Sequence, residues 1–260
     1  MTTSERGQVF GEVADDYHEV RPGYPAELAP ELLTQAGGGP VLEVGAGTGK
    51  ATAAFAALGA DLTCLEPDPR MAAVLRRTVP GVPVVETTFE DWVPDRAYRL
   101  LISAQAWHWV DEDRRSELAH AALAPGGLFA PFWNVFAVVD RTLYAALAEV
   151  DARHGLSGEH TPHCLFAGDV PDEPRPAAEE WAFLALPDEL FTEPRTLRYR
   201  SRRSYPAALY RRHLESISVY RALPAAAAEA VLDDTVAVLE AHGGTIDFHV
   251  YTDVALSHRR

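Results

Sequence analysis

Three glycines at alternate positions, Gly45, Gly47 and Gly49, form the most chemically informative pattern in this sequence. They follow the short apolar stretch 41–44 and precede an alanine-rich stretch that reads as a helix. Glycine has no Cβ, so it permits a sharp turn and lets a ligand approach the backbone closely. A helix that begins after such a turn directs free N–H groups toward the ligand. The pattern therefore predicts a binding site for a nucleotide-type cofactor.

The glycine spacing and one acidic residue narrow the choice of cofactor. Dinucleotide enzymes usually show G-x-G-x-x-G, whereas this chain has G-x-G-x-G, which disfavours a pyrophosphate ligand. Glu66 lies about twenty residues after the loop, where a carboxylate accepts hydrogen bonds from ribose hydroxyls. A carboxylate at this place suits NAD and S-adenosylmethionine equally. A glutamate that only caps the next helix is the structural alternative.

Two further groups of residues could carry chemistry. His108 follows a predicted strand, at the carboxyl edge where α/β sheets bind ligands, and its imidazole could act as a general base. A histidine between two tryptophans is also typical of simple packing. In the arginine-rich stretch 195–203, Arg198, Arg200 and Arg202 would share one face of a strand. That face could bind an acidic substrate or a peptide, or it could protect an exposed sheet edge.

Alternating strands and helices must position these residues. Strands are predicted over 41–44, 61–66, 82–87, 98–103, 128–133, 196–199 and 246–256, and helices over 26–36, 48–58, 71–78, 114–123, 140–154, 207–220 and 225–242. This alternation is typical of βαβ units around a parallel sheet. The stretch 155–176 is rich in glycine, proline and charge, so a lid inserted after the fifth strand is expected there.

Composition limits the classes of partner. The net charge is −15 and the sequence pI is about 5.0, which disfavours general nucleic-acid binding because phosphate attraction dominates it. No apolar run approaches the ~20 residues of a membrane span, and the first residues lack an apolar signal-peptide core. Cys64 and Cys164 lie far apart without a CxxC partner, so buried free thiols are expected. A cytoplasmic monomer or homodimer without a metal site follows as the expectation.

Several motifs resemble those of class I S-adenosylmethionine-dependent methyltransferases. They are Leu42 to Gly49, Glu66-Pro67-Asp68, Phe89-Glu90-Asp91 and Leu123 to Gly127, in the order typical of that family. Phe10 to Tyr17, Arg21 to Pro25 and Ser103 to Trp109 are similar to the trans-aconitate methyltransferase-like group. That group has a Thr-His-Ser stretch where this chain has Ser216-Ile217-Ser218. The departure lies where the acceptor pocket is expected, so the acceptor is not carried over.

The resemblance implies a single Rossmann-like domain with a seven-stranded, mostly parallel sheet, an antiparallel last strand and helices on both faces. Residues 1–40 would form a helical flap, 41–133 the cofactor-binding core, 134–194 the lid, and 195–260 the C-terminal strands and helices. The implied cofactor is S-adenosyl-L-methionine, which leaves as S-adenosyl-L-homocysteine. The implied contacts are Tyr17, Arg21, Glu43, Gly45, Ala46, Gly47, Thr48, Gly49, Glu66, Pro67, Met71, Phe89, Glu90, Ala104, Gln105 and Trp109.

Some of these contacts have physical reasons of their own. The face of an aromatic ring attracts a sulfonium as it attracts an ammonium, and Tyr17, Phe89, Trp107 and Trp109 are candidates for this role or for core packing. Phe89 is expected against adenine, with Glu90 or Asp91 accepting from its amine. Tyr17 and Arg21 are expected on the flap over the cofactor.

The expected reaction is in-line displacement of the methyl group by a small-molecule acceptor, such as a carboxylate or a natural-product scaffold of secondary metabolism. A peptide acceptor stays open. An ionised carboxylate would need no base, whereas other acceptors could use His108. The alternatives are an NAD-dependent reductase and an S-adenosylmethionine-binding protein that does not transfer methyl groups.

Overall fold

The apolar stretches around the glycine loop form two short, central strands in the computed structural model, which describes residues 14–157 and 160–260. All residues of β1 (Val41–Val44) and β2 (Leu62–Leu65) are buried, and the two strands pair in parallel. Complete burial is typical of parallel strands that are covered on both faces. Val41 packs toward one face of the sheet and Leu42 toward the other.

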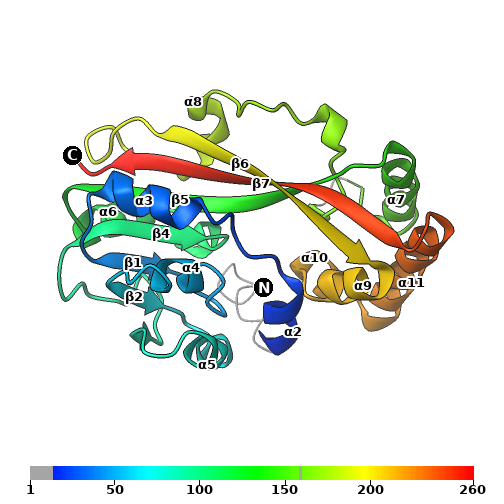
Figure 1. Ribbon diagram of the computed structural model, residues 1–260, viewed down its shortest axis with the longest axis horizontal. Helices are drawn as coiled ribbons and strands as arrows, with labels where there is room; N and C mark the ends of the chain where they lie inside the picture. The colour runs from blue at the N-terminus through cyan, green and yellow to red at the C-terminus, as the bar shows by residue number, and fades with distance from the viewer. Residues whose placement is uncertain (1–13, 158–159) are drawn as a thin grey trace.

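The sheet contains seven strands in the order β3-β2-β1-β4-β5-β7-β6 (Figure 1). The remaining strands are β3 (Val84–Val85), β4 (Tyr98–Ala104), β5 (Leu123–Val138), β6 (Arg195–Pro206) and β7 (Thr245–His258). β7 runs antiparallel to both β5 and β6, and the pairs from β3 to β5 are parallel. This topology confirms the predicted fold class.

Helices cover both faces of the sheet. The helices are α2 (Ala14–Val20), α3 (Leu28–Ala36), α4 (Thr52–Ala56), α5 (Pro69–Thr78), α6 (Arg115–Ala122), α7 (Arg141–Arg153), α8 (Ala177–Glu180), α9 (Ala207–Glu215), α10 (Ser218–Arg221) and α11 (Ala225–Ala241), with single turns η2 (Trp107–Trp109), η3 (Ala167–Asp169) and η4 (Ala182–Leu184). Buried residues of α3 and α4 pack with Val41, whereas those of α6 pack with Leu42. None of the helices in the described ranges is long and apolar enough to cross a bilayer.

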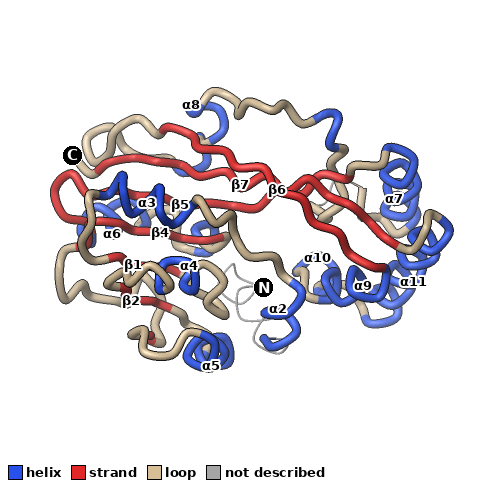
Figure 2. The backbone as a smooth tube through the Cα atoms, viewed as in Figure 1, coloured by secondary structure: helices blue, strands red, loops and turns tan. Residues whose placement is uncertain are grey.

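The long strands β5, β6 and β7 extend well beyond β1 and β2 (Figure 2). At their far end α7, α9 and α11 share one apolar core with Phe248 and Val250 of β7. α2 lies between α5 and α9 and contacts both helices. The C-terminal half therefore brings a second group of helices to the edge of the sheet where the cofactor loop lies.

Several predicted boundaries were wrong. The fifth strand was predicted over 128–133 and the sixth over 196–199, but β5 and β6 are longer because β7 pairs along most of both. The predicted lid from residue 134 therefore begins inside β5, and α7 packs into the C-terminal core. The helix predicted over 207–220 is broken into α9 and α10, and the helical pattern at Phe10 and Val13 lies outside the described residues.

Candidate functional site

The glycine loop adopts backbone conformations that favour glycine. Gly45, Gly47 and Gly49 have φ values of 70°, 57° and 86°. A Cβ on Gly45 would lie 2.4 Å from Cβ of Ala106, so the loop after β4 packs directly on the glycine turn. The N–H groups of Gly45 and Ala46 both donate to the carbonyl of Leu65. The turn is thus fixed by β2 on one side and by the β4 loop on the other.

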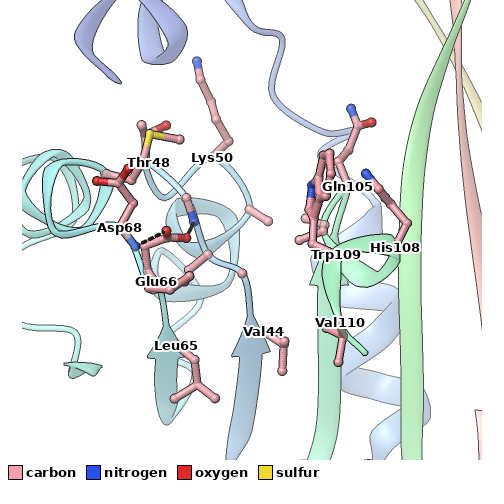
Figure 3. Close-up of a pocket in the computed structure, with 18 of the residues that line it drawn as sticks. Val44, Thr48, Lys50, Leu65, Glu66, Asp68, Gln105, His108, Trp109 and Val110 are labelled. Carbon is pink, nitrogen blue, oxygen red and sulfur yellow. Dashed lines mark hydrogen bonds between the residues drawn. The ribbon is translucent and has the colours of Figure 1, made fainter. Parts of the chain in front are cut away.

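Glu66 lies at the end of β2 and joins the two halves of the loop (Figure 3). Its Oε2 accepts from the Gly47 N–H at 2.7 Å, and its Oε1 accepts from the Asp68 N–H at 2.9 Å. Burial raises the pKa of Glu66 to about 7, against the lowering effect of these two hydrogen bonds. Asp68, not Glu66, is the cap of α5, since its carboxylate accepts from the Arg70 N–H. The capping alternative for Glu66 was therefore wrong.

A cavity of about 620 Å³ opens at the carboxyl edge of the parallel strands, which is within the range of small-molecule sites. Figure 3 shows Glu66 and Asp68 on one side of it and Gln105, His108 and Trp109 on the other. The predicted residues that line it are Tyr17, Arg21, Gly45, Ala46, Gly47, Thr48, Glu66, Pro67, Met71, Phe89, Glu90, Ala104, Gln105, His108 and Trp109.

Glu43 and Gly49 are the predicted contacts that do not line the cavity. Glu43 is fully buried beneath the loop, where its Oε2 accepts from Thr52 Oγ1 at 2.7 Å and from the Cys64 thiol. Burial raises the pKa of Glu43 to about 7. Gly49 packs against Leu75 of α5. Direct contact of either residue with a cofactor is not supported, because both face the core.

The two tryptophans in the loop after β4, Trp107 and Trp109, lie in different environments. Gln105 has a φ of 58°, which is uncommon for a residue other than glycine, and it turns the chain back toward the cavity. Trp107 is fully buried among Phe89 and Phe129, so core packing is the one of its two predicted roles that the structure supports. Trp109 lines the cavity. Trp107 anchors the turn from the core side.

The side chain of His108 lines the cavity and is exposed to solvent there, while the protein around the ring still reduces its hydration. The indole N–H of Trp133 donates to its Nδ1 at 3.5 Å. Burial, with a contribution from the charge of Arg115, lowers the pKa of His108 to about 4. At neutral pH the imidazole is therefore uncharged, and it is a weaker base than a histidine with the usual pKa of 6.5.

Phe89 and Glu90 are held mainly by the protein itself. Phe89 lines the cavity but is only 3% exposed, and its ring packs on Trp92 and Trp107. Glu90 accepts a hydrogen bond from the Asp111 N–H at 2.7 Å. The two residues form a fixed wall at the β3 end of the cavity.

The N-terminal segment closes the cavity from the other side. The Arg21 guanidinium donates to Oγ and to the carbonyl of Ser216 at 3.1 and 3.0 Å, and it lies 4.9 Å from the centre of the Tyr17 ring. His18 of α2 is hydrogen-bonded to Thr48 of the glycine loop at 3.0 Å. α2 is therefore attached both to the cofactor loop and to the α9–α10 junction.

Sequence reasoning missed several residues of the cavity wall. Lys50, the only lysine of the chain, lines the cavity, as do His160, Ile217 and Ser218 of the C-terminal half. The stretch 214–220 had been marked by its similarity to a family stretch, which was the one available signal for Ile217 and Ser218. No local pattern marks His160, because its position depends on contacts between distant helices.

The arginine-rich strand β6 lies at the free edge of the sheet and does not line the cavity. Arg198 forms a paired contact with Asp253 of β7 at 2.6 and 2.7 Å, and Arg200 pairs with Asp172. Arg202 and Arg203 are exposed. These contacts support the interpretation that the arginines protect an exposed sheet edge.

No group of three His, Cys, Asp or Glu side chains suited to a metal ion occurs within residues 14–157 and 160–260. Cys64 is buried, whereas Cys164 is partly exposed, and both are free thiols.

The part of the chain that supplies most of this site is similar to known methyltransferases. Residues 41–127 match a family described as methyltransferase domain. An uncharacterized methyltransferase of Mycobacterium tuberculosis is 38% identical over 137 residues, which are 52% of this chain and 56% of the relative. A probable S-adenosylmethionine-dependent methyltransferase of Saccharomyces cerevisiae is 28% identical over 127 residues, 45% of this chain and 43% of the relative. The match thus spans about half the length of these relatives.

The fold has a solved counterpart over most of its length. A putative type II methyltransferase from Anaeromyxobacter dehalogenans superposes with a TM-score of 0.61 at 23% identity, covering 92% of this chain and 97% of that one. This likeness confirms the Rossmann-like methyltransferase fold. Residues 41–127 thus resemble a methyltransferase domain, and the name of the relative from Saccharomyces cerevisiae specifies S-adenosylmethionine for that protein.

The residues at the site fit this cofactor. Gly45 and Gly47 line the cavity with their backbone, and Glu66 places a carboxylate at its edge.

Proposed function

We propose that this chain transfers a methyl group from S-adenosylmethionine to a small-molecule acceptor. The observation that carries the proposal is the joined pair of Glu66 and Gly47 at one wall of a cavity of about 620 Å³. This pair presents a carboxylate and a glycine turn together, which suits a ligand with ribose hydroxyls. S-adenosylmethionine, when bound, supplies a methyl group already activated by its sulfonium.

The chain's own residues bind the cofactor and exclude water. In this proposal Glu66 holds the ribose, Phe89 and Glu90 bound the adenine, and Tyr17 and Arg21 cover the opposite end. Positioning of two reactants can lower a barrier by several kcal/mol, up to about 7–11 in favourable cases. With its pKa near 4 His108 is neutral, and because its Nδ1 accepts from Trp133, its Nε2–H is available to donate a hydrogen bond to the acceptor molecule. The cavity wall therefore acts mainly by orientation.

In this proposal different segments of the chain bind the cofactor and the acceptor. Residues 41–133 bind the cofactor, the described part of the flap covers it, and the C-terminal segments 134–194 and 195–260 shape the acceptor pocket. An ionised carboxylate is the first candidate acceptor, because it needs no general base and the Nδ1 of His108 is already engaged by Trp133. A natural-product scaffold is the second candidate. A peptide bound along β6 is disfavoured, because Arg198 and Arg200 are engaged by Asp253 and Asp172.

Calorimetry with S-adenosylhomocysteine and with NADH tests the cofactor. We expect S-adenosylhomocysteine to bind at one site per chain and NADH not to bind. Binding of NADH alone would overturn the proposal in favour of a reductase. Incubation with methyl-labelled S-adenosylmethionine and a panel of carboxylate, hydroxyl and amine acceptors then tests transfer, and binding without transfer to any of them would favour a non-methylating protein.

A further inference from the structure

A buried polar network lies behind the part of the cavity wall that the cofactor motifs do not supply. Asp151 of α7, His163 of the following loop and Tyr210 of α9 are at most 6% exposed. His163 is hydrogen-bonded through Nδ1 to Tyr210 Oη at 2.7 Å and through Nε2 to Asp151 Oδ1 at 3.2 Å. Thr161 Oγ1 donates to the other Asp151 oxygen at 2.9 Å.

One tautomer of His163 satisfies both of its hydrogen bonds. With the proton on Nε2, that N–H donates to a carboxylate oxygen of Asp151, and Nδ1 accepts from the Tyr210 hydroxyl. Burial raises the pKa of Tyr210 well above its usual value, which keeps that hydroxyl protonated. A buried network is costly unless its members are paired, and a fully paired one imposes a single geometry.

This geometry determines where His160 lies. Thr161 and His163 are both fixed to Asp151, and His160 immediately precedes them in the chain. Tyr210 belongs to α9, which is followed by the cavity-lining Ile217 and Ser218. The network therefore joins the loop that carries His160 to the helix that leads to the other C-terminal wall residues. In Figure 1, α7 and α9 both lie at the far end of the long strands.

The cavity lining has three parts, of which the N-terminal segment supplies Tyr17, Arg21, Pro22 and Tyr24. The lining residues from Val44 to Val110 belong to the region matched by the methyltransferase family, and this part would serve the methyl donor that the whole class shares. Beyond Val110 the lining consists of His160, Ile217 and Ser218. Acceptors differ between members of a class, so recognition of the acceptor is expected from segments outside the shared region. His160 is the imidazole on this part of the wall.

We propose that His160 contacts the methyl acceptor. The hydrogen-bonded residues Asp151, His163 and Tyr210 act as positioning residues that hold His160 in place. This inference rests on the proposed function. It assigns the acceptor end of the cavity to the side that His160 lines, away from Glu66. Tyr210 acts through His163 and does not touch the acceptor.

Two probes distinguish the cofactor end from the acceptor end. One is S-adenosylhomocysteine, and the other is its aza analogue in which a nitrogen replaces the sulfur and carries a benzyl group toward the acceptor side. The rate at which diethylpyrocarbonate carbethoxylates His160 is measured by mass spectrometry. The H160Q variant identifies the peptide that carries the modified His160. We expect S-adenosylhomocysteine to leave the modification rate within about twofold, and the benzyl analogue to slow it at least about fivefold, because a bound ligand buries most of its surface against the wall.

A matched pair of variants tests the positioning network. Tyr210→Phe removes a hydroxyl that donates to His163, whereas Tyr220→Phe removes a buried hydroxyl that has no hydrogen-bond partner in the described part of the chain. Tyr210→Phe should abolish protection of His160 by the benzyl analogue, and Tyr220→Phe should retain it. Both should bind S-adenosylhomocysteine as the parent does, which excludes general unfolding.

The outcomes separate this inference from the proposal that it rests on. If neither probe binds the parent chain in calorimetry, the proposed function fails, and this inference with it. If both bind but the benzyl analogue does not protect His160, or S-adenosylhomocysteine protects it equally, His160 does not face the acceptor. Equal protection in Tyr210→Phe and Tyr220→Phe would overturn the role of the network.

Discussion

The Glu66 carboxylate and the Gly47 backbone N–H are joined by a hydrogen bond of 2.7 Å across the mouth of the glycine turn. The bond links the end of β2 to the loop after β1, so the two cofactor motifs are one unit even without a ligand. Because the carboxylate is buried and its pKa lies near 7, it gains or loses a proton close to neutral pH. Cofactor binding should therefore be coupled to protonation.

We expect binding of S-adenosylhomocysteine at about pH 6.5 to release a fraction of a proton, because ribose hydroxyls donate to the ionised form of Glu66. Calorimetry in buffers of different ionisation enthalpy measures this release. Glu66→Gln should abolish it and weaken binding about tenfold or more, as expected for hydrogen bonds to a charged group. Glu43→Gln is the control, since Glu43 has a similar pKa but does not line the cavity. Proton release that persists in Glu66→Gln would contradict this assignment.

Glu43 should make the stability of the chain depend on pH. Burial raises its pKa from 4.5 to about 7, so the carboxyl favours the folded state fully below the unfolded value, and this contribution is lost as the pH rises through 7. Glu43→Gln cannot ionise. Its free energy of unfolding relative to the parent should therefore rise by about 1–3 kcal/mol between pH 5 and pH 8. Urea unfolding at the two pH values measures the difference, and an unchanged difference would show that Glu43 is already ionised at pH 5.

Substitutions of Gly45 and Gly59 distinguish the free-energy cost of a positive φ from the cost of steric crowding. Their φ values are 70° and 73°, but a Cβ on Gly45 would meet Ala106 at 2.4 Å, whereas one on Gly59 would meet no atom within 4 Å. Gly59→Ala should cost about 1 kcal/mol of stability from conformation alone. Gly45→Ala should cost about 1–3 kcal/mol more from overpacking and should also impair S-adenosylhomocysteine binding. Chemical unfolding and calorimetry test both statements, and equal effects at the two positions would refute the close packing of the two loops.

Local patterns predicted the cofactor end of the site better than the acceptor end. Gly45, Glu66 and Gln105 follow directly on three buried strands, and the carboxyl ends of parallel strands meet at one sheet edge. His160 and Ser218 reach the same cavity only because α7, α9 and β7 share a core. Trp107 and Trp109 illustrate the same limit, since one turn of backbone at Gln105 decides which of them is buried. The length of β6 likewise depended on its partner β7 and not on its own sequence.

Arg198 should stabilise the sheet edge and play no part in binding the cofactor. Its guanidinium pairs with Asp253, whose side chain is only 4% exposed. Arg198→Met would leave that carboxylate buried without its arginine, at a cost of about 3–5 kcal/mol. Arg202→Met, an exposed change on the same strand, should stay within about 0.5 kcal/mol of the parent. Urea unfolding measures both, and S-adenosylhomocysteine affinity should be unchanged in each. A selective loss of affinity in Arg198→Met would instead connect the edge to the cavity.

His108 should not titrate between about pH 5 and pH 8. Burial and the positive charge of Arg115 lower its pKa from 6.5 to about 4, and the Trp133 N–H occupies its Nδ1 lone pair. In protein labelled at the histidine Cε1 carbon, the His108 signal, identified with His108→Gln, should stay at the neutral position over this range.

The lowered pKa of His108 also makes the free energy of unfolding depend on pH. It contributes stability above about pH 6.5, and that contribution is lost as the pH falls toward 4. His108→Gln should therefore lose less stability than the parent on acidification. A signal that titrates near pH 6.5 would restore His108 as a general base, because the same imidazole would then take up a proton close to neutral pH.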